Sequence, residues 1–281
     1  MLEYNGMKVR KNCLPAGWYP RDPVEISSFL AKFDSGSGEK GKIAIAPHAG
    51  WFYSGKIAAK AASSLIREID TITVIGGHLP GNHPPLFAME DAVETPLGNF
   101  SIDAELRNAV IGDIKGSDDI YRDNTVEVLL PMLRYFLPKA SLLWMRFGAD
   151  IKAYSAGIAL ANAAAKLGRR IAVLASADLT HYGPNYGFMP KGTGRQALQW
   201  VQQVNDRRLI EAVETGDAVA VLERAETEFS SCSAGALLGA MGAASVFCNA
   251  SARLLEYGSS AGKETEIPDS FVGYAAMLWE G

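Results

Sequence analysis

Short, continuously apolar runs that end at glycine, proline or serine constrain the fold of this chain more than any other feature. Three of them are KIAIA (42–46), TITVIG (71–76) and RIAVLAS (170–176). Strands of this kind are buried on both faces, as in parallel sheets covered by helices. The sequence therefore predicts an α/β fold with a central, mostly parallel sheet flanked by helices. The three strands are expected to lie near one another, with their carboxyl ends on one edge.

The segments between these strands have the periodicity of helices. Apolar residues recur at helical spacing over 57–69, and Ser54 is the expected N-cap of that helix. A second helix is expected to be capped by Asp150 and to run to Lys166, with Gly168 suited to the position after a helix. Strand, helix and strand in this order form a βαβ unit, whose crossover is right-handed.

The remainder of the chain adds elements of both kinds. Further strands are expected at 141–147 and 270–279, and further helices at 194–213 and 233–247. The last of these helices consists of small residues and is apolar on all sides, which is typical of a helix packed inside a protein. Two segments, 79–103 and 255–269, interrupt the order, and the second is expected to be an exposed hairpin or loop. Because no linker divides the chain, one domain over 1–281 is expected.

Three of the four histidines lie just past or at the ends of predicted strands: His48, His78 and His181. Loops at the carboxyl ends of parallel strands converge on one edge of the sheet. Imidazole is the commonest metal ligand and the usual proton carrier near neutral pH. The sequence therefore predicts a metal or acid–base site at this edge. His83 lies deeper in a proline-rich loop, where a structural role is the simpler interpretation.

Asp178 precedes His181 by three residues in SADLTHYG. A carboxylate that accepts a hydrogen bond from one imidazole nitrogen fixes the tautomer and raises the basicity of the other nitrogen. We therefore expect Asp178 to hydrogen-bond His181, directly or through the turn between them. His181 would then face the pocket as an acid–base group.

Cys232 directly precedes the predicted apolar helix. The positive end of a helix dipole lowers the pKa of a thiol, and the resulting thiolate binds soft and borderline metals. Taken alone, a free cysteine is more often simply buried, and this structural interpretation is kept for Cys13 and Cys248.

Composition limits the partners that the chain can have. The net charge is −4 and the isoelectric point is about 5.7, which argues against a nucleic-acid partner. No run approaches the roughly 18 apolar residues of a membrane span, and MLEYNGMKVRKN lacks the apolar stretch of a signal peptide. The three cysteines are odd in number and form no framework, which favours a reducing compartment. We expect a cytoplasmic protein with no membrane or nucleic-acid partner.

A set of motifs gives the chain a resemblance to the Memo family. The motifs are AGWYP (16–20), APHAGWFYSG (46–55), VIGGH (74–78), ETPLGNF (94–100), DNTVEVLLPML (123–133), SADLTHYG (176–183), the isolated Cys232 and FVGYAAM (271–277). They occur in family order and cover nearly the whole chain. The resemblance implies an α/β fold similar to that of class III extradiol dioxygenases, the non-haem iron enzymes that open catechol rings. Bacterial and archaeal members are often labelled AmmeMemoRadiSam system protein B, which implies radical-SAM and AMMECR-type protein partners.

Carried over by resemblance, the Memo metal ligands fall on His48, His78 and Cys232, with Asp178 and His181 lining the same pocket. His78 matches better than His83 because its spacing to ETPLGNF agrees with the family. The three ligands are expected to converge, and His181 is expected to stay outside the ligand set so that one metal position remains open.

The chain departs from the family pattern at several positions. Gly77 stands where the family commonly has histidine or serine, and Asp123-Asn124-Thr125 stands where it usually has Glu-His-Ser. Leu129 replaces a polar residue. These changes make the pocket less polar, which affects substrate chemistry more than metal binding.

Three functions remain open at this point. The first is a mononuclear metal-dependent oxidoreductase, with iron as the expected divalent metal and copper as an alternative, in which His181 is the acid–base group and Asp178 orients it. In the extradiol relatives two histidines and a carboxylate hold the iron, whereas here a thiolate would replace the carboxylate. The second is a non-catalytic protein that binds a metal, small molecule or peptide in the same pocket. The third is a zinc hydrolase, in which an open metal position activates water.

Overall fold

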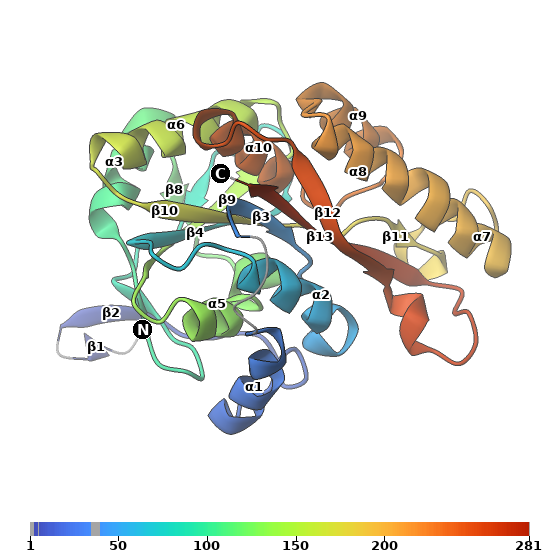
Figure 1. The fold of residues 1–281 in the computed structure, drawn as a ribbon, viewed down its shortest axis with the longest axis horizontal. Helices are drawn as coiled ribbons and strands as arrows, with labels where there is room; N and C mark the ends of the chain where they lie inside the picture. The colour runs from blue at the N-terminus through green and yellow to red at the C-terminus, as the bar shows by residue number, and fades with distance from the viewer. Residues whose placement is uncertain (1–2, 5, 35–39, 281) are drawn as a thin grey trace.

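The computed structural model describes residues 3–4, 6–34 and 40–280. It is a mixed α/β structure in which helices cover both faces of a central sheet (Figure 1). Among the described helices, none combines the length and the apolar character needed to cross a membrane.

The central sheet has nine strands within the described residues. They are β3 (Gly41–Ala46), β4 (Thr71–Leu79), β5 (Leu86–Phe87), β8 (Ser117–Asp118), β9 (Ser141–Gly148), β10 (Ile171–Ser176), β11 (His181–Tyr182), β12 (Ala252–Ser259) and β13 (Phe271–Glu280). The order is β11-β13-β3-β10-β4-β9-β5-β8, and β12 pairs with β13. The four central strands β3, β10, β4 and β9 are parallel, whereas β13 and β5 join them antiparallel. The predicted parallel core is confirmed, although the sheet as a whole is mixed.

A small second sheet lies beside the first. It is formed by β1 (Glu3–Tyr4), β2 (Met7–Arg10), β6 (Ala92–Val93) and β7 (Phe100–Ser101). Two of its strands come from the proline- and glycine-rich segment 79–103, which the sequence marked as an interruption between the main elements. This segment therefore adds edge structure and leaves the central strands undisturbed.

The helices form two layers (Figure 1). One face of the sheet is covered by α1 (Pro23–Leu30), α2 (Trp51–Ser63) and α5 (Leu130–Phe136), near the short helix α4 (Asn124–Glu127). The other face is covered by α3 (Ala104–Ile114), α6 (Lys152–Lys166), α8 (Asp206–Glu214), α9 (Ala218–Thr227) and α10 (Ala234–Phe247). Helix α7 (Arg195–Trp200) and the turns η1 (Ala31–Phe33), η2 (Pro184–Tyr186), η3 (Val201–Asn205) and η4 (Ser260–Lys263) complete the described elements.

Strand β3 shows why the sheet needs both layers. Ile43 and Ile45 are buried in the core on the side of α6 and α10, while Ala44 and Ala46 are buried in the core on the side of α2. Alternate residues of a strand point to opposite faces, so an apolar run without alternation requires cover on both sides. Helix α10 can pack closely on α6 because Gly157 has no β-carbon. A β-carbon at this position would lie 1.9 Å from the Gly239 carbonyl oxygen.

Several boundaries differ from the expected ones. Helix α2 begins at Trp51 after Gly50, so Ser54 lies inside the helix, where its hydroxyl donates to the Ala49 carbonyl. Helix α6 begins one residue later than expected, although the Asp150 carboxylate accepts the Lys152 amide. The expected helix over 194–213 is α7, the π-helical turn η3 and α8 in succession.

The segment 255–269 was expected to be an exposed hairpin or loop. Its first part belongs to β12, which pairs antiparallel with β13, and its second part is the connection between these two strands. Gly168 has φ +63°, as expected for the residue after a helix.

Candidate metal centre

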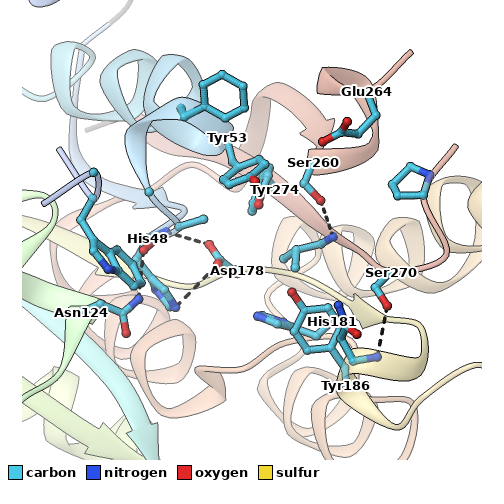
Figure 2. Close-up of a pocket in the computed structure, with 18 of the residues that line it drawn as sticks. His48, Tyr53, Asn124, Asp178, His181, Tyr186, Ser260, Glu264, Ser270 and Tyr274 are labelled. Atoms are coloured by element: carbon cyan, nitrogen blue, oxygen red, sulfur yellow. Dashed lines mark hydrogen bonds and ion pairs between the residues drawn. The ribbon is translucent and has the colours of Figure 1, made fainter. Parts of the chain in front are cut away.

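Two neighbouring strands bring His48 and Asp178 together at the carboxyl edge of the sheet. Ala46 of β3 is paired with Ser176 of β10, and a single residue separates each of them from His48 and Asp178, respectively. The His48 amide donates to Asp178 Oδ1 at 2.7 Å, and His48 Nε2 lies 3.8 Å from Asp178 Oδ2 (Figure 2). Both residues are buried. The loop after β3 is therefore held by the loop after β10.

His48, His78 and Cys232 meet at one point, as expected from the strand ends together with the family resemblance. The two Nε2 atoms lie 3.2 Å apart, and the Cys232 sulfur lies 3.3 Å from His48 Nε2. All three potential ligand atoms are within 4.8 Å of one another. His48 and Cys232 are 184 positions apart in the chain, so the cluster depends on the folded sheet.

The second nitrogen of each imidazole has its own partner. His48 Nδ1 lies 2.9 Å from the Ser176 hydroxyl, and His78 Nδ1 lies 3.0 Å from Asp123 Oδ2. Histidines that bind metals characteristically use the other ring nitrogen in such a hydrogen bond, which fixes the orientation of the ring. Here both rings direct Nε2 toward the shared point. Two imidazole nitrogens and a sulfur form a donor set suited to iron, copper or zinc.

The charges of the cluster favour a thiolate at Cys232. Burial raises the pKa of this thiol, but His48 and His78 together hold it well below its usual range. The sequence predicted the same direction from the helix dipole, whereas the structure adds the two neighbouring imidazoles as its cause. The Cys232 sulfur also lies 3.4 Å from the Ser233 hydroxyl. A thiolate held in this way is the form that binds a metal ion.

The pKa values of the two imidazoles are shifted in the opposite direction, upward. Burial lowers the pKa of His78, but the hydrogen bond to Asp123 and the nearby Cys232 raise it to about 10. Burial likewise lowers the pKa of His48, and the charges of Asp178 and Cys232 reverse the shift and raise it. The metal-free cluster therefore favours imidazolium and thiolate. A divalent cation would replace these protons, because a metal ligand must be deprotonated.

The backbone around His78 is unusual. This residue has φ +57°, a left-handed conformation that non-glycine residues adopt infrequently. The pairing between β4 and β9 shifts register between Gly76 and Leu79, so His78 lies in a bulge. A bulge changes the direction of a side chain at a strand end, and here the His78 ring faces His48 edge-on with the ring centroids 4.8 Å apart.

An open cavity of about 760 Å³ lies over the histidines (Figure 2). His48, His78, Asp178 and His181 line it, together with Asn124, whose side chain donates to the His48 carbonyl at 3.0 Å. Aromatic side chains form much of the remaining wall: Trp18, Phe52, Tyr53, Tyr186 and Tyr274. Cavities of several hundred Å³ accept small organic ligands.

His181 lines this cavity as expected. Of the two routes expected between Asp178 and His181, a direct hydrogen bond or a contact through the turn, the described hydrogen bonds contain only a contact of His181 with the turn. The Asp178 carboxylate contacts His48, whereas His181 Nδ1 lies 3.1 Å from the carbonyl of Leu179 in the turn between the two residues. Within the described part of the chain no further hydrogen bond is found for the His181 ring, so Nε2 is available to a ligand. The ring stands edge-on to Tyr186, with the centroids 4.9 Å apart.

Burial raises the pKa of Asp178, and the neighbouring His48 opposes this shift. Asp178 contacts His48 directly because β3 and β10 are adjacent, which brings the ends of these two strands together. Asp178 therefore holds His48 in place by accepting its backbone amide.

Other histidines and cysteines lie outside the cluster. His83 Nδ1 lies 2.8 Å from the Pro84 carbonyl, and the residue lines a separate cavity of about 440 Å³. The Cys13 sulfur lies 2.9 Å from a Glu127 carboxylate oxygen, and Cys248 is the C-cap residue that follows α10. Burial raises the pKa of Cys13 to about 11, with Glu127 acting in the same direction, so this thiol remains protonated.

The two residues that contact the histidine rings at Nδ1 were not among the site residues predicted from the sequence. Ser176 was visible only as the last residue of a strand, and Asp123 only as a departure from the family pattern. Asp123 had one local signal, since an aspartate before Asn124-Thr125 is typical of a helix N-cap, and it does cap α4. Leu129, another departure, is buried in the core on the side of α2.

Known proteins resemble this chain over nearly its full length. The sequence profile of Memo-like proteins matches residues 10–278. A MEMO1 family protein of Methanosarcina barkeri is 30% identical over 281 residues, which cover 97% of this chain and 100% of the relative. A MEMO1 family protein of Methanococcoides burtonii is 30% identical over 241 residues, which cover 84% of this chain and 85% of the relative.

Among solved structures, an uncharacterized protein from Escherichia coli K12 matches with a TM-score of 0.49 and 12% identity, covering 84% of this chain and 99% of that chain. The family profile spans almost all of the sequence, and the relative from Methanosarcina barkeri aligns with it almost from end to end. This chain therefore belongs to the family of Memo-like proteins.

Proposed function

We propose that this protein binds one redox-active metal ion, iron or copper, and oxidises a small organic molecule in the cavity above it. The observation that carries the proposal is the meeting of His48, His78 and Cys232 beside a cavity of about 760 Å³. Iron is preferred because the resemblance to class III extradiol dioxygenases implies it.

The residues present fit such an ion. Both imidazoles are held by partners at Nδ1, which leaves Nε2 free to act as a ligand, and the thiol of Cys232 is poised as a thiolate. Three protein ligands leave at least one position open for another molecule. When bound, iron or copper would supply electron transfer and the activation of dioxygen.

The protein side chains supply binding and proton transfer. Tyr53, Tyr186 and Tyr274 offer apolar ring surface and hydroxyl groups to an organic ligand. His181 would move a proton at Nε2, because its Nδ1 is occupied by the Leu179 carbonyl. Asp178 would keep His48 in place through the backbone amide.

The test begins with protein purified without oxygen and analysed for its metal content. His48→Ala and Cys232→Ala are expected to lose the metal. His181→Ala is expected to keep it and to lose turnover by about 10²–10⁴-fold, the usual contribution of a general acid–base group. Oxygen consumption with catechol and related dihydroxy aromatic compounds measures turnover. Loss of the metal in His181→Ala would show that His181 is a ligand.

Two other outcomes would replace the proposal. Zinc in the anaerobic protein, with metal-dependent cleavage of p-nitrophenyl acetate and no oxygen uptake, would identify a hydrolase. A tightly held metal without either activity would indicate a binding protein for a small molecule or peptide. The radical-SAM and AMMECR-type partners implied by the resemblance are tested separately, by co-purification with the wild-type chain.

A further inference from the structure

We propose that Arg146 is a positioning residue for His78 and thereby sets the metal affinity of the site. The inference rests on the proposed metal centre. Arg146 does not line the cavity and contacts neither His48 nor Cys232 in any described hydrogen bond. Its influence would pass through Asp123 and through the backbone of the bulge that carries His78.

Three contacts hold the Arg146 guanidinium. Its Nε donates to the Gly77 carbonyl at 3.1 Å, one nitrogen donates to Asp119 Oδ1 at 3.2 Å, and the other lies 3.2 Å from Asp123 Oδ2. The Arg146 side chain is 3% exposed. A guanidinium presents its donors in a rigid plane, so these three contacts fix the relative positions of their acceptors.

Two of the acceptors belong directly to the surroundings of His78. The Gly77 carbonyl is part of the bulge in which His78 adopts its left-handed conformation. Asp123 Oδ2, the oxygen beside Arg146, is also the atom that lies 3.0 Å from His78 Nδ1. A strained backbone conformation persists only where the surrounding structure holds it. Arg146 supports both the backbone and the ring of the same ligand.

The third acceptor anchors Arg146 itself. Asp119 is fully buried, and its second carboxylate oxygen accepts the Trp144 indole N–H at 2.9 Å. Trp144 and Arg146 are both on β9, the strand next to β4. The chain Asp119–Arg146–Asp123–His78 thus connects the interior of the sheet to the metal site. A buried ion pair that served stability alone would not need to include the hydrogen-bond partner of a ligand.

Arg146→Lys tests the inference because lysine keeps the positive charge and loses the planar set of donors. Zn²⁺ affinity, measured by competition with a chromogenic chelator, is expected to fall about 10–100-fold, the usual effect of altering the partners of a metal ligand. Arg107→Lys is the matched control. Arg107 is also buried and donates to the carbonyls of Ala88 and Glu90, away from the site. The control is expected to keep wild-type affinity.

A second readout uses the metal-free protein. The His78 Nδ1 proton bonded to Asp123 should give a downfield proton NMR signal that exchanges slowly with water. Asp123→Asn identifies this signal by removing the carboxylate that holds the proton. The signal is expected to be lost or to exchange rapidly in Arg146→Lys and to persist in Arg107→Lys. Persistence in Arg146→Lys, together with unchanged Zn²⁺ affinity, would overturn the inference.

If Arg146→Lys does not fold, Asp119→Asn provides the test, because it loosens the anchor of Arg146 and keeps every group around His78. It is expected to weaken Zn²⁺ binding and to speed exchange of the His78 proton, and wild-type values of both would overturn the inference. If the wild-type protein binds no metal, the proposed function fails, whereas the exchange of this proton still decides the role of Arg146.

Discussion

At the residue scale, the site depends on a glycine that leaves space for another side chain. Gly77 lies against Ser233, and a β-carbon at position 77 would lie 2.3 Å from the Ser233 hydroxyl oxygen. The same hydroxyl lies 3.4 Å from the Cys232 sulfur. Ser233 therefore occupies the space that a side chain at position 77 would need.

Gly77→Ala is expected to destabilise the protein by about 1–3 kcal/mol, because overpacking a buried site forces its neighbours to move. The double variant with Ser233→Gly should recover part of this loss. Gly112→Ala on the exposed side of α3 is the control, since no atom of the described residues lies within 4 Å of a β-carbon there. The control should be stabilised by up to about 1 kcal/mol. Urea denaturation measures all three, and equal effects of Gly77→Ala and Gly112→Ala would contradict the argument.

At the element scale, the π-helical turn η3 connects α7 and α8 to the loop after β10. Asn205, the last residue of η3, donates to the Thr180 hydroxyl at 2.9 Å, and Asp206, the first of α8, accepts the Thr180 amide at 3.0 Å. The phenol of Tyr257 on β12 donates to the second oxygen of Asp206 at 2.7 Å. Thr180 lies between Asp178 and His181, so this buried polar group supports the loop that lines the cavity.

The buried carboxyl of Asp206 makes the stability of the protein depend on pH. Burial raises the pKa of Asp206 to about 6, against the opposing hydrogen bonds from Thr180 and Tyr257. In the unfolded chain an aspartate has a pKa of about 3.9. As the pH rises through this interval, the unfolded chain releases a proton that the folded protein keeps, so the folded state loses stability. The loss is about 2–3 kcal/mol and is complete above about pH 6.

Asp206→Asn is expected to remove this part of the pH dependence. The free energy of unfolding of the wild-type protein, relative to that of the variant, should fall by about 2–3 kcal/mol between pH 4 and pH 7. Denaturant titration at a series of pH values gives the difference. Parallel profiles for the two proteins would show that Asp206 does not titrate in this range.

At the scale of the whole molecule, the three proposed metal ligands come from distant parts of the fold. His48 follows β3, His78 lies in the bulge at the end of β4, and Cys232 precedes α10. An ion bound to all three would hold the sheet edge and the start of α10 together. Since the unfolded chain lacks this arrangement, the free energy of metal binding becomes free energy of folding.

Zn²⁺ at about a hundredfold excess over its Kd should therefore raise the free energy of unfolding by about 2.7 kcal/mol. The melting temperature should rise by several degrees and return to its starting value after chelation. Cys232→Ala is the control and should show no rise. An equal rise in wild-type protein and Cys232→Ala would place the ion elsewhere.

Much of this organisation was predictable from local sequence. The runs at 42–46, 71–76 and 170–176 became central strands, because an apolar run without alternation is stable only when both faces are covered. The histidines at the ends of these strands indicated the edge that carries the site. Cys232 could be added from the family resemblance. The extent of a single domain over 1–281 stays a prediction.

The sequence by itself determined which segments form strands and helices and which residues stand at the strand ends, since periodicity and burial act within a segment. The tertiary structure decided that β10 lies between β3 and β4, so that Asp178 supports His48. It also decided that Ser176 and Asp123 contact the rings of His48 and His78 and that Arg146 pairs with Asp123. The physical reason is that strand order and side-chain partners arise from contacts between residues far apart in the chain, which no local pattern encodes.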